Sequence, residues 1–136
     1  MSASKAAAPR TPRVRTPKQR AGDAAEEAAC RYLAASGCRI VARNVRYRAG
    51  ELDVIVEHAG TLVFVEVRMR GRGDFGGAAA SVDFFKRRRL IRAAQQYLAQ
   101  TFAGRSRRQL PPCRFDVVTA DANGVSEWIR NAFGLD

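Results

Sequence analysis

The strongest constraint on the fold is a pair of apolar runs, 51–57 and 61–69, separated by a tight turn at Ala59-Gly60. Runs rich in Val, Ile and Phe on either side of such a turn predict a β-hairpin. A turn centred there pairs Asp53 with Glu66 and Ile55 with Phe64. The residues on the other face are wholly apolar, so we expect that face to be buried: Leu52, Val54, Val56, Val63, Val65 and Val67.

The acids of this hairpin need an explanation. Asp53 and Glu66 would lie directly opposite each other with Cβ atoms about 5 Å apart, which is unfavourable for like charges. Ile55 and Phe64 beside them make the surroundings partly dry and add a desolvation cost. A divalent cation offsets both costs, and Mg²⁺ favours one or two carboxylates together with substrate phosphate oxygens. The alternatives are an edge hairpin with solvated acids, or an ion pair between Glu66 and Arg68.

The order of the predicted elements indicates the fold class. A helix, three strands, a helix and a further strand form an α/β sandwich, in which helices pack on a mixed sheet. The last element cannot be typed from the sequence. The expected elements are a helix over 22–36, a strand over 39–47, the hairpin, a Gly-rich loop over 71–77, a helix over 83–102 capped by Ser81 or Asp83, a strand over 114–119 and the untyped segment 128–133.

Charge restricts the class of partner. The chain carries 24 Lys and Arg against 13 Asp and Glu, a net charge of +11, which favours nucleic acid over an anionic membrane surface. No apolar run approaches the ~20 residues of a membrane span. We therefore expect a cytoplasmic protein, with the nucleoid as an alternative location. Residues 1–20 hold basic residues without an acid and few large apolar ones, so we expect a disordered tail before a domain over 21–136.

Two charged side chains fall on the apolar stripes of the predicted helices. Glu26 shares its stripe with Ala29 and Leu33, so it needs a partner, which is either the metal site or an arginine. Lys86 shares its stripe with Leu90, so it can point inward. The second helix also begins with four consecutive cations, 86–89, which oppose its dipole. Either a phosphate backbone binds there, or this is a solvated basic face.

These residues resemble a known family. The blocks Gly50-Glu51-Leu52-Asp53-Val54-Ile55 and Leu62-Val63-Phe64-Val65-Glu66-Val67-Arg68 are similar to those of the YraN family, as are Phe75-Gly76, Lys86 and Arg114-Phe115-Asp116-Val117-Val118. The likeness covers roughly 22–133. It implies a restriction-endonuclease-like fold, a mixed β-sheet flanked by helices with an α-β-β-β-α-β core and the motif PD-(D/E)XK. Holliday-junction resolvases are the nearest characterised relatives in fold.

The resemblance also implies roles for individual residues. Asp53 and Glu66 correspond to metal ligands, joined by the backbone carbonyl of Val67, and Glu26 corresponds to the acid of the first helix. Arg68 stands where the superfamily has a lysine. An arginine stays protonated and cannot accept a proton from water, although it can stabilise phosphate charge. Lys86 is a candidate to replace the missing lysine.

Together these inferences predict a Mg²⁺- or Mn²⁺-dependent endonuclease, with DNA favoured over RNA and branched or damaged DNA as candidate substrates. The alternative is a catalytically inactive nuclease-fold protein that binds DNA or RNA as an accessory. Junction-cleaving relatives are dimers, which suggests a homodimer by analogy. The arginines expected to contact the nucleic-acid backbone are Arg48, Arg70, Arg72, Arg87, Arg88, Arg89 and Arg92.

Overall fold

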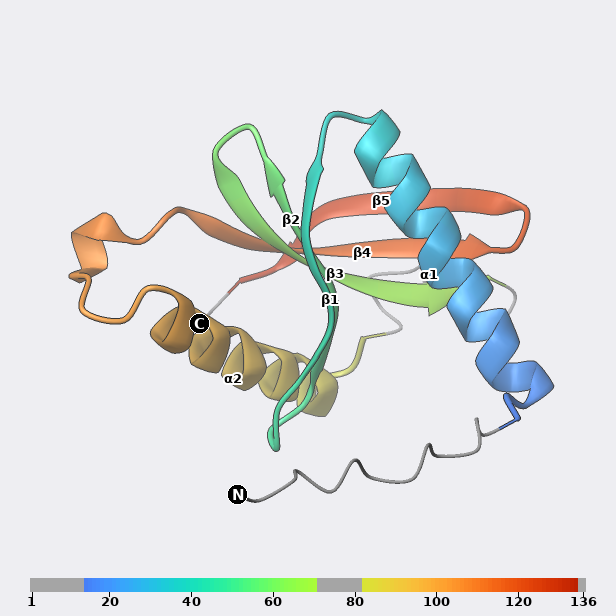
Figure 1. Ribbon diagram of the computed structural model, residues 1–136, viewed down its shortest axis with the longest axis horizontal. Helices are drawn as coiled ribbons and strands as arrows, with labels where there is room; N and C mark the ends of the chain where they lie inside the picture. Colours follow the sequence, from blue (N-terminus) through green and yellow to red (C-terminus); the bar gives the residue numbers. More distant parts are fainter. Residues whose placement is uncertain (1–13, 71–81, 135–136) are drawn as a thin grey trace, which may run out of the picture.

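The computed structural model describes residues 14–70 and 82–134. It confirms the mixed α/β class, with two helices packed on a five-stranded sheet (Figure 1). Arg72 and the Phe75-Gly76 pair lie outside the described residues. In chain order the elements are α1 (Pro17–Ala35), β1 (Arg39–Arg46), β2 (Glu51–His58), β3 (Thr61–Met69), α2 (Phe84–Thr101), the short 3-10 helix η2 (Arg107–Gln109), β4 (Cys113–Asp121) and β5 (Gly124–Phe133).

The strands lie in the sheet in their sequence order, β1-β2-β3-β4-β5. Neighbouring strands are antiparallel except β3 and β4, which are parallel and are connected through α2. The two helices cover opposite faces of the sheet, because α1 packs in one core cluster with Val54, Val63 and Val118, whereas α2 packs in the other with Ile55 and Phe64 (Figure 1). None of the described helices is long and apolar enough to cross a membrane.

The hairpin has the predicted register near its turn. Ile55 pairs with Phe64, and Ala59 and Gly60 both have positive φ, 50° and 84°, as expected for a two-residue hairpin turn. The expectation of one apolar buried face was too simple, because helices bury both faces of β2 and β3. Leu52 was also misplaced: it packs in the α2 cluster, opposite to Val54.

The first helix begins at Pro17 rather than near residue 22. Thr16 caps it, since its side chain accepts from the Gln19 N–H while the Gln19 side chain accepts from the Thr16 N–H, a capping box that fixes a helix start. Residues 17–20, expected within the tail, are therefore helical. The second helix is capped by Asp83, as predicted, and the untyped C-terminal segment belongs to β5.

Candidate metal centre

The hairpin separates at its acidic end. The pairing of β2 with β3 ends at Val54 and Val65, whereas β3 stays paired with β4 as far as Met69. Beyond this point the backbone N–H of Val67 donates to Asp53 Oδ2 at 2.9 Å. A carboxylate thus replaces a strand in satisfying this N–H, and the end of the hairpin is open.

A kink in β1 lies against the same opening. Asn44 has φ of 52° although it lies inside the strand, between the pairs formed by Arg43 with Val54 and Val45 with Leu52. Asparagine tolerates this left-handed conformation better than most residues. The strand alternation breaks here, and Leu52 turns toward α2 while Val54 faces α1.

Glu66 is the buried acid of the site, with 4% of its surface exposed. Its Oε1 accepts from Lys86 Nζ at 2.9 Å, so Lys86 does point inward, as its helix position predicted. Its Oε2 is buried and has no hydrogen-bond partner in the part of the chain that the structure describes. An unsatisfied buried carboxylate oxygen is costly, so this atom is suited to receive a cation or a donor that binds at the site.

Gly50 holds α2 close to the hairpin. A Cβ on Gly50 would lie 3.2 Å from the Arg89 carbonyl oxygen and 3.3 Å from Arg89 Cβ, closer than ordinary van der Waals contact. Only a residue without a side chain lets the β1–β2 turn approach the helix backbone this closely. The helix that carries Lys86 is thereby placed against the strand that carries Asp53.

Asp53 has strongly perturbed acidity. Burial and the nearby negative charge of Glu66 raise its pKa to about 8, against the opposing effects of the Val67 N–H and Lys86. The charge of Glu26 adds a smaller upward contribution to this pKa. In the metal-free protein Asp53 is therefore protonated at neutral pH, which is the state expected of a carboxyl that lacks a compensating cation.

Glu26 is paired with an arginine, one of the two partners that the sequence left open. Its Oε1 accepts from Arg43 Nη2 at 3.1 Å and from Asn44 Nδ2 at 2.9 Å. It nevertheless lines a hollow of about 270 Å³ together with Asp53 and Val67. Glu26 is therefore on the α1 side of Asp53, and a metal role for it would require it to share or leave Arg43.

A second hollow, of about 290 Å³, joins most of the predicted residues. It is lined by Asp53, Glu66, Val67, Arg68 and Lys86, together with Met69 and Lys18 of α1. Asp53 and Val67 line both hollows and thus connect them. The structure therefore brings together the five residues expected to act at the site, with Glu26 on its far side.

The donor set fits a hard divalent cation. Carboxylate oxygens of Asp53 and Glu66 and the Val67 carbonyl are the oxygen ligands that Mg²⁺ and Mn²⁺ prefer. Among the described residues there is no cluster of three or more His, Cys, Asp and Glu side chains placed for a metal. With two carboxylates and one carbonyl as ligands, a cation would complete its shell with water or phosphate oxygens, as Mg²⁺ commonly does.

The predicted backbone-contacting arginines differ in their surroundings. Arg70 lies 3.6 Å from Asp121 in an ion pair, and Arg87 is partly buried and donates to the Val82 carbonyl at 2.8 Å. Only the described members of the set can be placed. The exposed ones are Arg48, Arg70, Arg88, Arg89 and Arg92.

Sequence reasoning missed Lys18, Arg43 and Asn44. Lys18 was assigned to the tail, but the Thr16–Gln19 capping box and the spacing of Lys18 from Gly22 and Glu26 place it on the same helix face. An asparagine in the middle of the strand was the signal for the kink at Asn44. Arg43 carried no signal of its own.

Residues 25–120, which hold Glu26, Asp53, Glu66 and Lys86, match the model of the Uncharacterised protein family UPF0102. The chain belongs to this family, also called YraN. It is 49% identical over 119 residues to a UPF0102 protein of Ralstonia nicotianae, covering 85% of this chain and 87% of the relative. Identity is 51% over 117 residues to a UPF0102 protein of Cupriavidus metallidurans, covering 85% and 82% of the two chains.

A UPF0102 protein of Xanthomonas campestris is 50% identical over 120 residues, which are 88% of this chain and 95% of the relative. The UPF0102 match includes β1–β3, α2 and most of β4, and hence every residue of the second hollow except Lys18. Strand β5 lies beyond it. The family model therefore covers the carboxylate site, whereas the start of α1 and β5 lie outside it.

Proposed function

We propose that this UPF0102 protein is a metal-dependent nuclease that hydrolyses phosphodiester bonds in nucleic acid, with DNA the preferred substrate. The observation that carries the proposal is the pair Asp53 and Glu66. Glu66 Oε2 is buried and has no hydrogen-bond partner among residues 14–70 and 82–134, and the pKa of Asp53 is raised to about 8. A cation between them would relieve both costs.

The residues of the site have different roles in the proposed reaction. Asp53, Glu66 and the Val67 carbonyl would hold Mg²⁺ or Mn²⁺, which supplies a nucleophilic water and stabilises charge on the phosphate. Lys86 holds Glu66 in place through its ion pair and can neutralise phosphate charge. Arg68 remains protonated, so it can bind a phosphate oxygen but cannot remove a proton from water.

The test is cleavage of labelled single strands, duplexes, flaps and four-way junctions, each with Mg²⁺, Mn²⁺ or EDTA. We expect metal-dependent cutting that falls about 100-fold or more in Asp53→Asn and in Glu66→Gln, since each removes a ligand. Glu57→Gln is the matched control: Glu57 lies in the same strand, is exposed and pairs with Arg39. Variants that cut as fast as the parent, or a folded parent that cuts nothing, would contradict the proposal.

A second candidate function is favoured by the Lys86–Glu66 ion pair. This pair already neutralises Glu66 without a metal, and Arg68 stands where the nuclease motif has its lysine. Both features fit a nuclease fold that binds nucleic acid without cutting it. Calorimetric titration with Mn²⁺ separates the two: binding lost in Asp53→Asn supports the nuclease, whereas an absence of Mn²⁺ binding supports the accessory role.

A further inference from the structure

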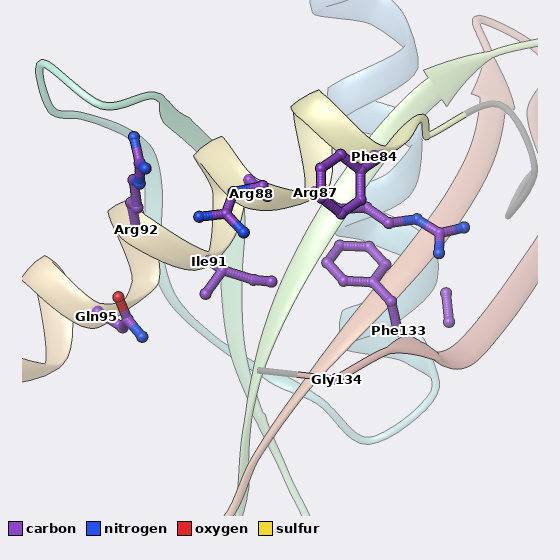
Figure 2. A pocket seen from close by; sticks show the side chains of 9 residues that line it. Phe84, Arg87, Arg88, Ile91, Arg92, Gln95, Phe133 and Gly134 are labelled. Atoms are coloured by element: carbon purple, nitrogen blue, oxygen red, sulfur yellow. The ribbon is translucent and has the colours of Figure 1, made fainter. Parts of the chain in front are cut away.

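A groove lies on another side of α2, away from the carboxylates. It has a volume of about 590 Å³ and runs between the first half of the helix and the end of β5. Figure 2 shows Phe84, Arg88, Ile91 and Arg92 projecting from α2, with Phe133 facing them from β5. No Asp or Glu is among its described lining residues.

The groove presents aromatic rings to solvent. Phe84 is 63% exposed although the Phe85 ring contacts it edge-on, with ring centroids 5.7 Å apart, and such exposure is unfavourable for a large apolar side chain. Phe133 is held in place by stacking on Phe115, with ring centroids 4.7 Å apart and an angle of 15° between the planes. The groove thus combines an exposed ring on the helix with a supported ring on the strand.

Arginines flank both rings. The Arg88 guanidinium lies 5.6 Å from the centre of the Phe84 ring, and that of Arg87 lies 5.3 Å from the centre of the Phe133 ring. The cation–π contact of Arg88 leaves the outer N–H groups of its guanidinium able to bind an anion. Each aromatic surface therefore has a cation beside it.

Two arginines of the groove, Arg88 and Arg92, carry charge that no described acid neutralises. Elsewhere arginines pair with acids, as Arg39 does with Glu57 and Arg114 with Asp116. By contrast, Arg88 and Arg92 are exposed and make no ion pair with any described residue. The first turn of α2 also carries no acid, so this region has an excess of positive charge that favours a polyanion.

We propose that this groove binds an unpaired stretch of nucleic acid, with a base on Phe84 and phosphates on Arg88 and Arg92. Aromatic rings in a basic groove are the usual binding surface for single strands, because every base has a face that can stack. A duplex keeps its base faces stacked on one another. The groove therefore favours unpaired over paired nucleic acid.

The position of the groove connects it to the carboxylate site. Phe84 and Arg88 are one helical turn apart and share a face of α2, whereas Lys86 lies on another face and contacts Glu66. The same two turns of α2 thus carry both regions. The inference rests on the proposed function for the identity of the ligand, and it narrows the substrate to nucleic acid with an unpaired segment beside the cleaved phosphate.

The test measures binding without cleavage. Fluorescence anisotropy in EDTA follows a labelled oligothymidylate and a labelled duplex of equal length. We expect Phe84→Ala to weaken oligothymidylate binding about tenfold, because stacking on one ring contributes roughly 1–3 kcal/mol, and to change duplex binding less than about twofold. Phe85→Ala is the matched control, since Phe85 is 75% exposed and adjacent but does not line the groove.

A second pair of variants tests the phosphate contacts. Arg88→Gln and Arg92→Gln should each lower the salt dependence of oligothymidylate binding by about one unit of logarithmic slope. Arg31→Gln, on the exposed face of α1, should leave that slope unchanged. Equal slopes for all three variants would contradict the role of Arg88 and Arg92.

Three results would contradict the proposal that the groove binds unpaired nucleic acid. These are equal losses of oligothymidylate and duplex binding in Phe84→Ala, equal effects of Phe84→Ala and Phe85→Ala, or a dimer in light scattering that Phe84→Ala converts to a monomer. The last would mean that a second copy of the chain occupies the groove. Because this binding is measured in EDTA and the cleavage assay requires a metal, failure of the groove is distinguishable from failure of the nuclease.

Discussion

The two ends of the β2–β3 hairpin differ in strand pairing and in the burial of their side chains. At the turn end, Ile55 pairs with Phe64 and Val56 with Val63, and all four side chains are buried. At the other end the strands part after Val54, and a side chain satisfies the Val67 N–H. The turn end is optimised for burial. At the open end, strand pairing is lost and two carboxyl groups come together. Functional sites commonly reduce the stability of a fold in this way.

The largest expected effect belongs to the turn end. Phe64→Ala should lower the free energy of unfolding by about 3–5 kcal/mol, because Phe64 is 1% exposed and its loss leaves a cavity between Phe115 and Tyr97. Urea unfolding followed by Trp128 fluorescence measures it. Thr61→Ala, beside the turn and partly exposed, is the control. If Phe64→Ala lowered the free energy of unfolding by less than about 1 kcal/mol, packing at the turn end would not be the main source of stability in the hairpin.

At the open end, Lys86→Met should lower the free energy of unfolding by roughly 1–3 kcal/mol at pH 7, because it leaves the Glu66 carboxylate buried without its cation. Lys86 is 35% exposed, so solvent screens part of this loss. The double variant Lys86→Met, Glu66→Gln should recover much of it, since the unpaired charge is then gone. A double-mutant cycle by urea unfolding tests this, and additive losses would contradict the coupling.

The raised pKa of Asp53 predicts an unusual dependence of the free energy of unfolding on pH. Its folded pKa is about 8 against 3.8 for an ordinary aspartate, so between these values the folded state holds a proton that the unfolded state lacks. Stability should therefore fall as pH rises through this window and level off above it. Measured in EDTA between pH 6 and 9, the parent should lose about 1 kcal/mol or more relative to Asp53→Asn. Parallel profiles for the two proteins would contradict the raised pKa.

The last prediction concerns the kink beside the open end. Asn44→Ala should cost about 1–2 kcal/mol, because alanine tolerates a φ of 52° poorly and cannot donate to Glu26. Asn44→Gly should cost less, since glycine adopts this conformation freely. Thermal unfolding of the two variants separates the backbone contribution from the hydrogen bond. Equal losses would place the whole effect in the hydrogen bond.

The periodicity of apolar residues was sufficient to predict the helices and strands and much of the candidate site. The turn at Ala59-Gly60 predicted the register of β2 and β3, which holds from the turn as far as Val54 and Val65, and helical spacing predicted that Lys86 points inward. The departures have local physical causes. Leu52 was misplaced because the kink at Asn44 breaks strand alternation, and a pattern of period two contains no information about a positive φ.

The start of α1 and the partner of Glu26 were harder to predict. Charge composition suggested a tail as far as residue 20, but the Thr16–Gln19 capping box begins the helix at Pro17 and brings Lys18 to the site. Arg43 and Glu26 lie 17 residues apart in sequence. Their pairing depends on how α1 crosses β1, which is a tertiary property that neither segment encodes alone.

The parallel pairing of β3 with β4 has a consequence for the order of folding. The hairpin that holds Asp53 and Glu66 needs only a two-residue turn, whereas β4 reaches β3 only after the chain has passed through α2. Long-range pairings close late, because their loop entropy is lost before their contacts form. We therefore expect Asp53 and Glu66 to come together early in folding. Lys86, which neutralises Glu66, reaches the site only when α2 packs on the sheet. Until then the hairpin would carry the charge of Glu66 without its cation.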